Sequence, residues 1–179
     1  MALRGIGVCF DKYEGSSYSG DDGNAKEVPM PIIRVQVPAG VFDEDATERL
    51  IAELNEASAD AEQMPKDPEY RMGLIIIWEQ LASGAIRSNG TDPTSMVVPV
   101  FLWFHPPQGV LDDEHAADYV ARVQRLFDEE GAKQGVMVTT SVAFQEITEG
   151  RWGIGGKINH LPDFAKRAGY RHLQHLVDA

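Results

Sequence analysis

An internal repeat is the feature that most restricts how this chain of 179 residues can fold. The stretch AGVFDEDA (39–46) aligns with QGVLDDEH (108–115), an offset of 69 residues. The stretch WEQLASGAI (78–86) aligns with FQEITEGRW (144–152), an offset of 66 residues. Each copy follows the order strand, turn, helix, strand, so the sequence predicts a tandem duplication of one β-α-β unit.

Local signals place the elements of each unit. Alternating apolar and polar residues in PIIRVQVP predict a first strand at 31–38, and Asp43 is the expected N-cap of the helix that follows. Asp112 is the expected cap of the corresponding helix in the second unit. The expected elements are a helix over 44–61 and a strand over 72–82 in the first unit, and a strand over 97–109, a helix over 113–130 and a strand over 135–147 in the second.

One β-α-β unit covers a single sheet face with a single helix, so two units are expected to share one sheet. The predicted fold class is therefore α+β, with two tandem β-α-β units that form a four-stranded mixed sheet carrying two helices on one face. Ile75, Ile77, Phe101 and Trp103 make the opposite face apolar. We expect a partner subunit to cover that face, and hence a homo-oligomer.

The two units are predicted to form one domain, with residues 31–95 as the first unit and 96–157 as the second. Residues 1–30 read as an extension, because EGSSYSGDDGNAKE (14–27) is rich in Gly, Ser and Asp, although GVCF (7–10) fits a short strand. Residues 158–179 read as a C-terminal helical tail that is rich in cations.

Composition excludes several partner classes. A net charge of −12 repels phosphate backbones, so no nucleic-acid partner is expected. No apolar run approaches the roughly 20 residues of a membrane span. Cys9 is the single cysteine and cannot form an internal disulfide, which fits a cytoplasmic protein. Among so many acids, an arginine close to a cleft is a candidate clamp for an anionic substrate.

Three features of the sequence resemble the tautomerase superfamily, the family of 4-oxalocrotonate tautomerase. These are MPIIRVQVPAGVFDEDATERLIAEL (30–54), SVAFQEITEGRWGIGGK (141–157) and the duplication itself, which is similar to fused members that carry two units in one chain. The resemblance covers about residues 31–157. It implies an isomerase without cofactor or metal, acting as a homo-oligomer, with a trimer favoured.

The resemblance also implies a mechanism in which Pro31, exposed as the first residue, is the general base and acid. A secondary amine in an apolar pocket has a pKa lowered toward neutrality, because burial disfavours its charged form. Such an amine can move a proton between the carbon and oxygen of a small enolisable or unsaturated carboxylic acid or ketone. Dehalogenation and decarboxylation are related activities of the family.

The alternative for Pro31 is an internal proline at the first position of a strand, where strands accept it. Its nitrogen is then an amide and has no proton to exchange. On that interpretation the protein is a non-catalytic member of the same fold that serves as a binding or assembly module.

The sequence departs from the family pattern at the anion-binding positions. The family arginines fall at Val41 and Val110, and at about Ile75 and Ser141. The cations that could replace them as substrate-binding residues are Arg34, Arg71, Arg87 and Arg151, although Arg34 equally fits a solvated strand face.

Two aromatic residues and two histidines remain as candidates. Trp152 falls at the position of the family aromatic residue, and Trp152 and Trp103 are candidate pocket walls, with core or interface packing as the alternative. His172 and His175 alone are too few to indicate a metal site, so no metal is expected.

Overall fold

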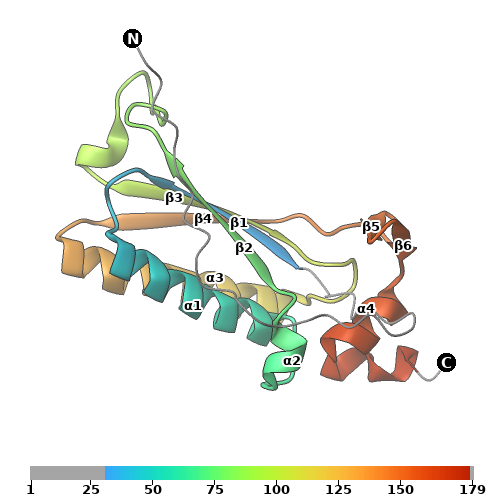
Figure 1. Ribbon diagram of the computed structural model, residues 1–179. Coiled ribbons are helices and arrows are strands. Elements are labelled where there is room, and N and C mark those ends of the chain that lie inside the picture. The colour runs from blue at the N-terminus through green and yellow to red at the C-terminus, as the bar shows by residue number, and fades with distance from the viewer. Residues whose placement is uncertain (1–30, 178–179) are drawn as a thin grey trace, which may run out of the picture.

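The computed structural model describes residues 31–177, which fold into a four-stranded mixed sheet with two long helices packed against one of its faces (Figure 1). The strand order is β2-β1-β3-β4. The strands are β1 (Ile32–Pro38), β2 (Ile75–Leu81), β3 (Val98–His105) and β4 (Val138–Phe144), and the long helices are α1 (Glu44–Ala61) and α3 (Asp113–Gln134).

The pairing of the strands confirms the predicted architecture. β1 pairs with β2 in parallel, and β3 pairs with β4 in parallel, so each pair is one β-α-β unit. β1 and β3 pair antiparallel in the centre and join the two units into one sheet. The predicted α+β fold with two helices on one face is therefore correct.

Both helices begin at the predicted caps. The Asp43 carboxylate accepts a hydrogen bond from the Ala46 amide at 2.8 Å, and the Asp112 carboxylate accepts one from the His115 amide at 2.8 Å. Each bond satisfies an amide that the first helical turn leaves unpaired. α3 runs four residues beyond the predicted end at 130 and stops at Gly135, whose φ of 71° is left-handed and suits glycine.

The core lies between the sheet and the two helices. Alternate residues of the central strands point to it, as the full burial of Ile33 and Val35 on β1 and of Phe104 on β3 shows. Leu54 of α1 and Phe127 of α3 meet them from the helix side. The period of two along the strands and the helical period along α1 and α3 thus point to one shared interior.

The opposite face of the sheet carries no helix, and its apolar residues are partly open to solvent. Ile75 is 38% exposed and Ile77 is 42% exposed. Phe101 and Trp103 of β3 are half-buried on the same face, with ring centroids 6.2 Å apart. We call this surface the open sheet face. Within residues 31–177 no helix has the length and apolarity needed to cross a membrane.

The connecting segments are more structured than predicted. The loop before β2 contains the short helix α2 (Pro68–Arg71), and the loop before β3 contains the 3-10 turn η1 (Pro93–Ser95). The predicted Gly-rich turn at 148–156 contains one strand of a hairpin, formed by β5 (Trp152–Ile154) and β6 (Lys157–Asn159). The predicted strands at 72–82, 97–109 and 135–147 are each shorter at both ends.

The C-terminal tail is divided into α4 (Leu161–Ala168) and the 3-10 helix η2 (Arg171–Leu176). The break falls at Gly169, which has a φ of 64°. After the break, the hydroxyl of fully buried Tyr170 donates a hydrogen bond at 2.9 Å to the carboxyl of Glu62, just beyond α1. The possible strand at 7–10 lies outside the described residues.

Candidate functional site

A pocket of about 370 Å³ opens on the open sheet face, at the end where β1 begins and β3 ends. The hairpin β5–β6 and α4 lie at this end of the sheet (Figure 1). Apolar and charged side chains share the lining, which consists of Ile32, Arg34, Ile77, Glu79, His105, Ile147, Arg151 and Trp152.

The register of the strands brings together the residues that form the floor of the pocket. Ile32 of β1 lies opposite His105 of β3, and Arg34 lies opposite Ile77 of β2. Because side chains alternate between the two faces of a strand, the burial of Ile33 against the helices directs Ile32 and Arg34 to the open face. Three strands of the sheet thus contribute to one site.

The segment after β4 forms the wall. The Ile147 amide donates to the Pro106 carbonyl at 2.9 Å, and Ile147 forms a parallel bridge with Pro107 beyond the ends of β3 and β4. This segment leads into β5, where Trp152 is only 9% exposed. Its ring packs on that of Phe164, with ring centroids 5.3 Å apart. The wall is therefore held by backbone hydrogen bonds on one side and by an aromatic contact on the other.

Within the described residues, one arginine of the pocket forms an ion pair and the other does not. Glu79 accepts hydrogen bonds from Gln36 at 2.7 Å and from Arg34 at 2.8 Å, and these two contacts hold the pKa of the Glu79 carboxyl below its ordinary value. Arg151 is exposed and forms no ion pair with any residue in 31–177. The unpaired cation is therefore Arg151, and a carboxylate entering the pocket would meet it.

Pro31 precedes Ile32, the first residue of the lining, but is not itself part of the lining. It is buried, and its carbonyl accepts a hydrogen bond at 3.1 Å from the Ile75 amide, which fixes the start of β1 against β2. In the full sequence Met30 precedes it, so its nitrogen is an amide unless the chain is processed to begin at Pro31. Its catalytic role stays a prediction.

Three of the predicted binding residues, Arg34, Arg151 and Trp152, come together in the lining. Trp103 lies on the same face, opposite Arg34 in the register, but is not part of the lining. Arg87 lies in the loop between β2 and β3 and forms an ion pair with Asp92 at 3.5 Å.

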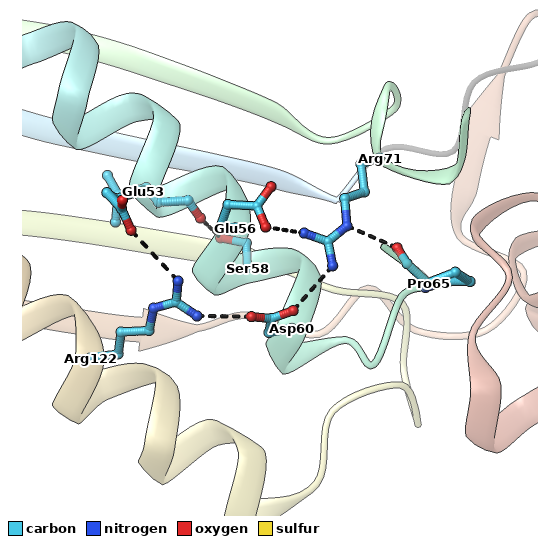
Figure 2. Close-up of polar contacts among 8 residues, drawn as sticks. Glu53, Glu56, Ser58, Asp60, Pro65, Arg71 and Arg122 are labelled. Atoms are coloured by element: carbon cyan, nitrogen blue, oxygen red, sulfur yellow. Dashed lines mark hydrogen bonds and ion pairs between the residues drawn. The ribbon is translucent and has the colours of Figure 1, made fainter. Parts of the chain in front are cut away.

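Arg71 is held on the helix side of the sheet (Figure 2). Its guanidinium binds the carboxylates of Glu56 and, at 3.1 Å, Asp60, and donates to the Pro65 carbonyl at 2.8 Å. Asp60 also accepts from Arg122 of α3 at 2.9 Å. Figure 2 shows that these contacts join α1, α3 and the segment around α2, so Arg71 takes part in a structural network away from the pocket.

The sequence interpretation did not name five of the lining residues as site residues, namely Ile32, Ile77, Glu79, His105 and Ile147. Of these, His105 has the side chain best suited to proton transfer. It is half-buried, and its ring has no hydrogen-bond partner among residues 31–177. The alternation of β3 does place it on the same face as Trp103, two residues earlier, and this signal was available from the sequence. Its position beside Ile32 depends on the register of β1 with β3, which the sequence does not give.

Other pockets lie between α1 and α3, away from the open sheet face. A second pocket of about 370 Å³ lies between α1 and α3 and is lined by Asp60, His115, Asp118, Arg122 and Arg125 with several alanines and Tyr119. Within 31–177 no group of three or more His, Cys, Asp or Glu side chains is placed to hold a metal ion.

Comparison with known proteins identifies the fold. The native fused 4-OT is 21% identical, with a TM-score of 0.57, over 72% of this chain and 95% of that one. N1, a member of the cis-3-chloroacrylic acid dehalogenase family, is 18% identical, with a TM-score of 0.58, over 83% of this chain and all of that one. The macrophage migration inhibitory factor of Toxoplasma gondii is 16% identical, with a TM-score of 0.53, over 72% of this chain and all of that one.

These neighbours are tautomerase superfamily proteins, and the chain shares their fold. The predicted resemblance to fused two-unit tautomerases is confirmed at that level. No protein-family model matches the chain. The search of curated proteins also found no match.

Proposed function

We propose that this protein is a tautomerase-like isomerase that acts on a small enolisable or unsaturated 2-oxo acid, with Pro31 as general base and acid in the form that begins at that residue. The pocket beside the start of β1 is the site. The observation that carries the proposal is the composition of the pocket lining. It includes Ile32, the residue after Pro31, and combines an unpaired arginine, an aromatic wall and aliphatic side chains.

The chemistry follows from the lining. Arg151 binds the substrate carboxylate, and Trp152, Ile32 and Ile147 surround the carbon skeleton. In the form that begins at Pro31, the amine directly precedes Ile32 of the pocket, and an apolar environment favours its neutral form, which makes it a base at neutral pH. The amine removes a proton from the carbon next to the carbonyl and returns it to the oxygen. Arg151 stabilises the negative charge that develops between these steps.

Two of the structural neighbours act on, or are inactivated by, acids of this class. Pt0534 was crystallised after inactivation by 2-oxo-3-pentynoate, an unsaturated 2-oxo acid, and has a TM-score of 0.57 with this chain. The neighbour N1 belongs to a family that removes halogen from an unsaturated acid. A small unsaturated or oxo acid is thus the class that the pocket and the neighbours both favour.

We further propose a homotrimer in the cytoplasm. One neighbour was solved as a fused 4-OT asymmetric trimer, and this chain shares its fold. The exposure of Ile75 and Ile77 leaves the open sheet face available to a second copy. Covering this face also encloses the pocket, since Ile77 belongs to both surfaces.

One observation favours the second candidate, a non-catalytic binding or assembly protein. Thirty residues precede Pro31 in the sequence, and while they remain attached its nitrogen is an amide. The two candidates therefore differ in the first residue of the mature protein. Intact mass and N-terminal sequencing of the native protein measure it.

Turnover by three forms of the protein tests the proposed reaction. The first begins at Pro31, the second retains Met30 in front of it, and the third carries Pro31→Ala in the first form. The probe is 2-oxobutanoate in D₂O, and proton NMR follows exchange of its C3 protons. We expect exchange at least about 100-fold faster in the first form than in the second, because general base catalysis contributes factors of this size. Equal rates in these two forms contradict a role for the Pro31 amine.

A further inference from the structure

His105 is the one side chain of the pocket lining whose residue type exchanges a proton near neutral pH. The other ionisable lining residues are Arg34, Glu79 and Arg151. Glu79 is held as a carboxylate by Arg34 and Gln36, whose hydrogen bonds lower its pKa.

The position of His105 suits proton transfer to a bound acid. It is the last residue of β3 and lies opposite Ile32, directly after Pro31, so it borders the same part of the pocket as the start of β1. Its ring is half-buried and makes no hydrogen bond within residues 31–177, so both ring nitrogens are available to a ligand. A substrate carboxylate on Arg151 shares this pocket with the imidazole.

We propose that His105 is a second proton-transfer residue of this pocket, which enolises a 2-oxo acid even while Pro31 is in a peptide bond. The inference rests on the proposed function, because it assumes that the pocket binds 2-oxo acids. It differs from that function in requiring no processing of the chain.

The proposed enolisation conserves protons and electrons within the pocket. A neutral imidazole nitrogen takes a proton from C3 of the oxo acid, and the C3–H electron pair forms the C2–C3 double bond. The carbonyl π pair moves to the C2 oxygen, giving an enolate. The imidazolium then returns its proton to that oxygen, which yields the enol and restores neutral His105. No oxidant, metal or second substrate takes part.

Two cations and one anion share the pocket with His105. Arg34 and Arg151 are cations, Glu79 is an anion paired with Arg34, and the remaining lining residues are uncharged. Only the neutral imidazole accepts a proton, so the rate of the full chain should fall as the solution becomes acidic.

The experiment uses the full chain, with residues 1–30 attached, and measures deuterium exchange at C3 of 2-oxobutanoate. His105→Gln keeps a polar side chain of similar reach, and His175→Gln is the matched control because His175 is exposed on η2 and lies outside the lining. We expect exchange above that of free histidine in the wild type. We expect His105→Gln to lower kcat about 100-fold or more, to leave KM within about threefold and to remove the acid limb of the pH profile. The control should match the wild type.

A second variant keeps the test decisive if His105→Gln folds poorly. His105→Ala leaves space in the pocket, and added imidazole should restore exchange there but not in Arg151→Ala. Absence of exchange in the full chain overturns the inference, as does an unchanged rate in His105→Gln. If the form beginning at Pro31 is active in either case, the proposed function stands without His105. If neither form exchanges the probe, both proposals fail.

Discussion

Ile32 and His105 lie directly opposite each other in the antiparallel pair of β1 and β3, so the end of the second unit's first strand meets the start of the first unit. The repeat offset of 69 residues maps this pair onto Phe101 and Gln36, which also lie opposite each other. The duplication therefore has an approximate twofold relation within the sheet.

The two related positions are chemically different. One end of the sheet has Ile32 and His105, and the other has Phe101 and Gln36. The Gln36 side chain donates a hydrogen bond to Glu79. Pro31 has no counterpart at the matching position of the second unit, where Val100 stands and Pro99 lies one place earlier within β3. Duplication thus supplied two equivalent strand ends, and divergence left one of them with the features of a site.

Arg151 should control substrate binding more than the chemical step. We expect Arg151→Ala, in the form beginning at Pro31, to raise KM for 2-oxobutanoate by about tenfold or more, because a hydrogen bond to a charged group contributes about 1.5–3 kcal/mol. Arg87→Ala is the control, since Arg87 is paired with Asp92 away from the pocket. Steady-state kinetics measures both. An unchanged KM in Arg151→Ala would place the carboxylate elsewhere.

Glu62 should make the protein less stable as pH rises. Complete burial raises the pKa of its carboxyl to about 8, against a smaller opposing effect of the hydrogen bond from Tyr170. The folded state therefore favours the protonated acid more than the unfolded state does. This contribution is fully present below pH about 4.5, the unfolded value, and is lost as pH rises toward about 8, by up to about 1.4 kcal/mol per pH unit.

Glu62→Gln should remove most of this dependence, because the amide cannot ionise and still accepts the Tyr170 hydrogen bond. Urea unfolding at pH 6 and pH 9 measures the difference in the free energy of unfolding. The variant should be the more stable protein at pH 9. Glu56→Gln, on the surface of α1, should retain the wild-type pH dependence. A wild type equally stable at both pH values would show that Glu62 does not titrate as proposed.

The open sheet face should hold the oligomer together. We expect Phe101→Glu to dissociate it, because a charge placed among half-buried apolar side chains must be desolvated for the subunits to join. Met96→Glu is the matched control, since Met96 is 80% exposed and lies outside the strands of the sheet. Sedimentation equilibrium should give a trimer for the wild type and the control, and a monomer for Phe101→Glu. A wild-type monomer, or a trimer that survives Phe101→Glu, would contradict this interface.

Local signals were sufficient to predict the framework. The caps at Asp43 and Asp112 and the alternation in β1 depend on near neighbours in the chain, so the sequence contains them. The break in the C-terminal tail is different. A Cβ at Gly169 would lie 2.8 Å from the ring of Tyr70, and this contact with α2 is not visible in the local pattern.

Only part of the site was predicted, because local signals identify some of its residues and only the fold brings the others together. Arg151 and Trp152 are neighbours in a segment whose repeat was recognised, so residue type and spacing identified them. His105 required the register of β1 with β3. Arg71 has the right chemistry for an anion, but the carboxylates of Glu56 and Asp60 on α1 already bind it, and the sequence pattern did not predict these contacts.

The central claim is that Pro31, once it is the first residue, presents a nucleophilic amine to this pocket. Peptide mapping by mass spectrometry after treatment with 2-oxo-3-pentynoate, the compound that inactivates Pt0534, tests it most directly. We expect one adduct on the Pro31 nitrogen in the form beginning at that residue, with matching loss of activity, and no adduct at Pro31 in the form that retains Met30. An unlabelled Pro31 in the first form, or inactivation by labelling at another residue, would contradict it.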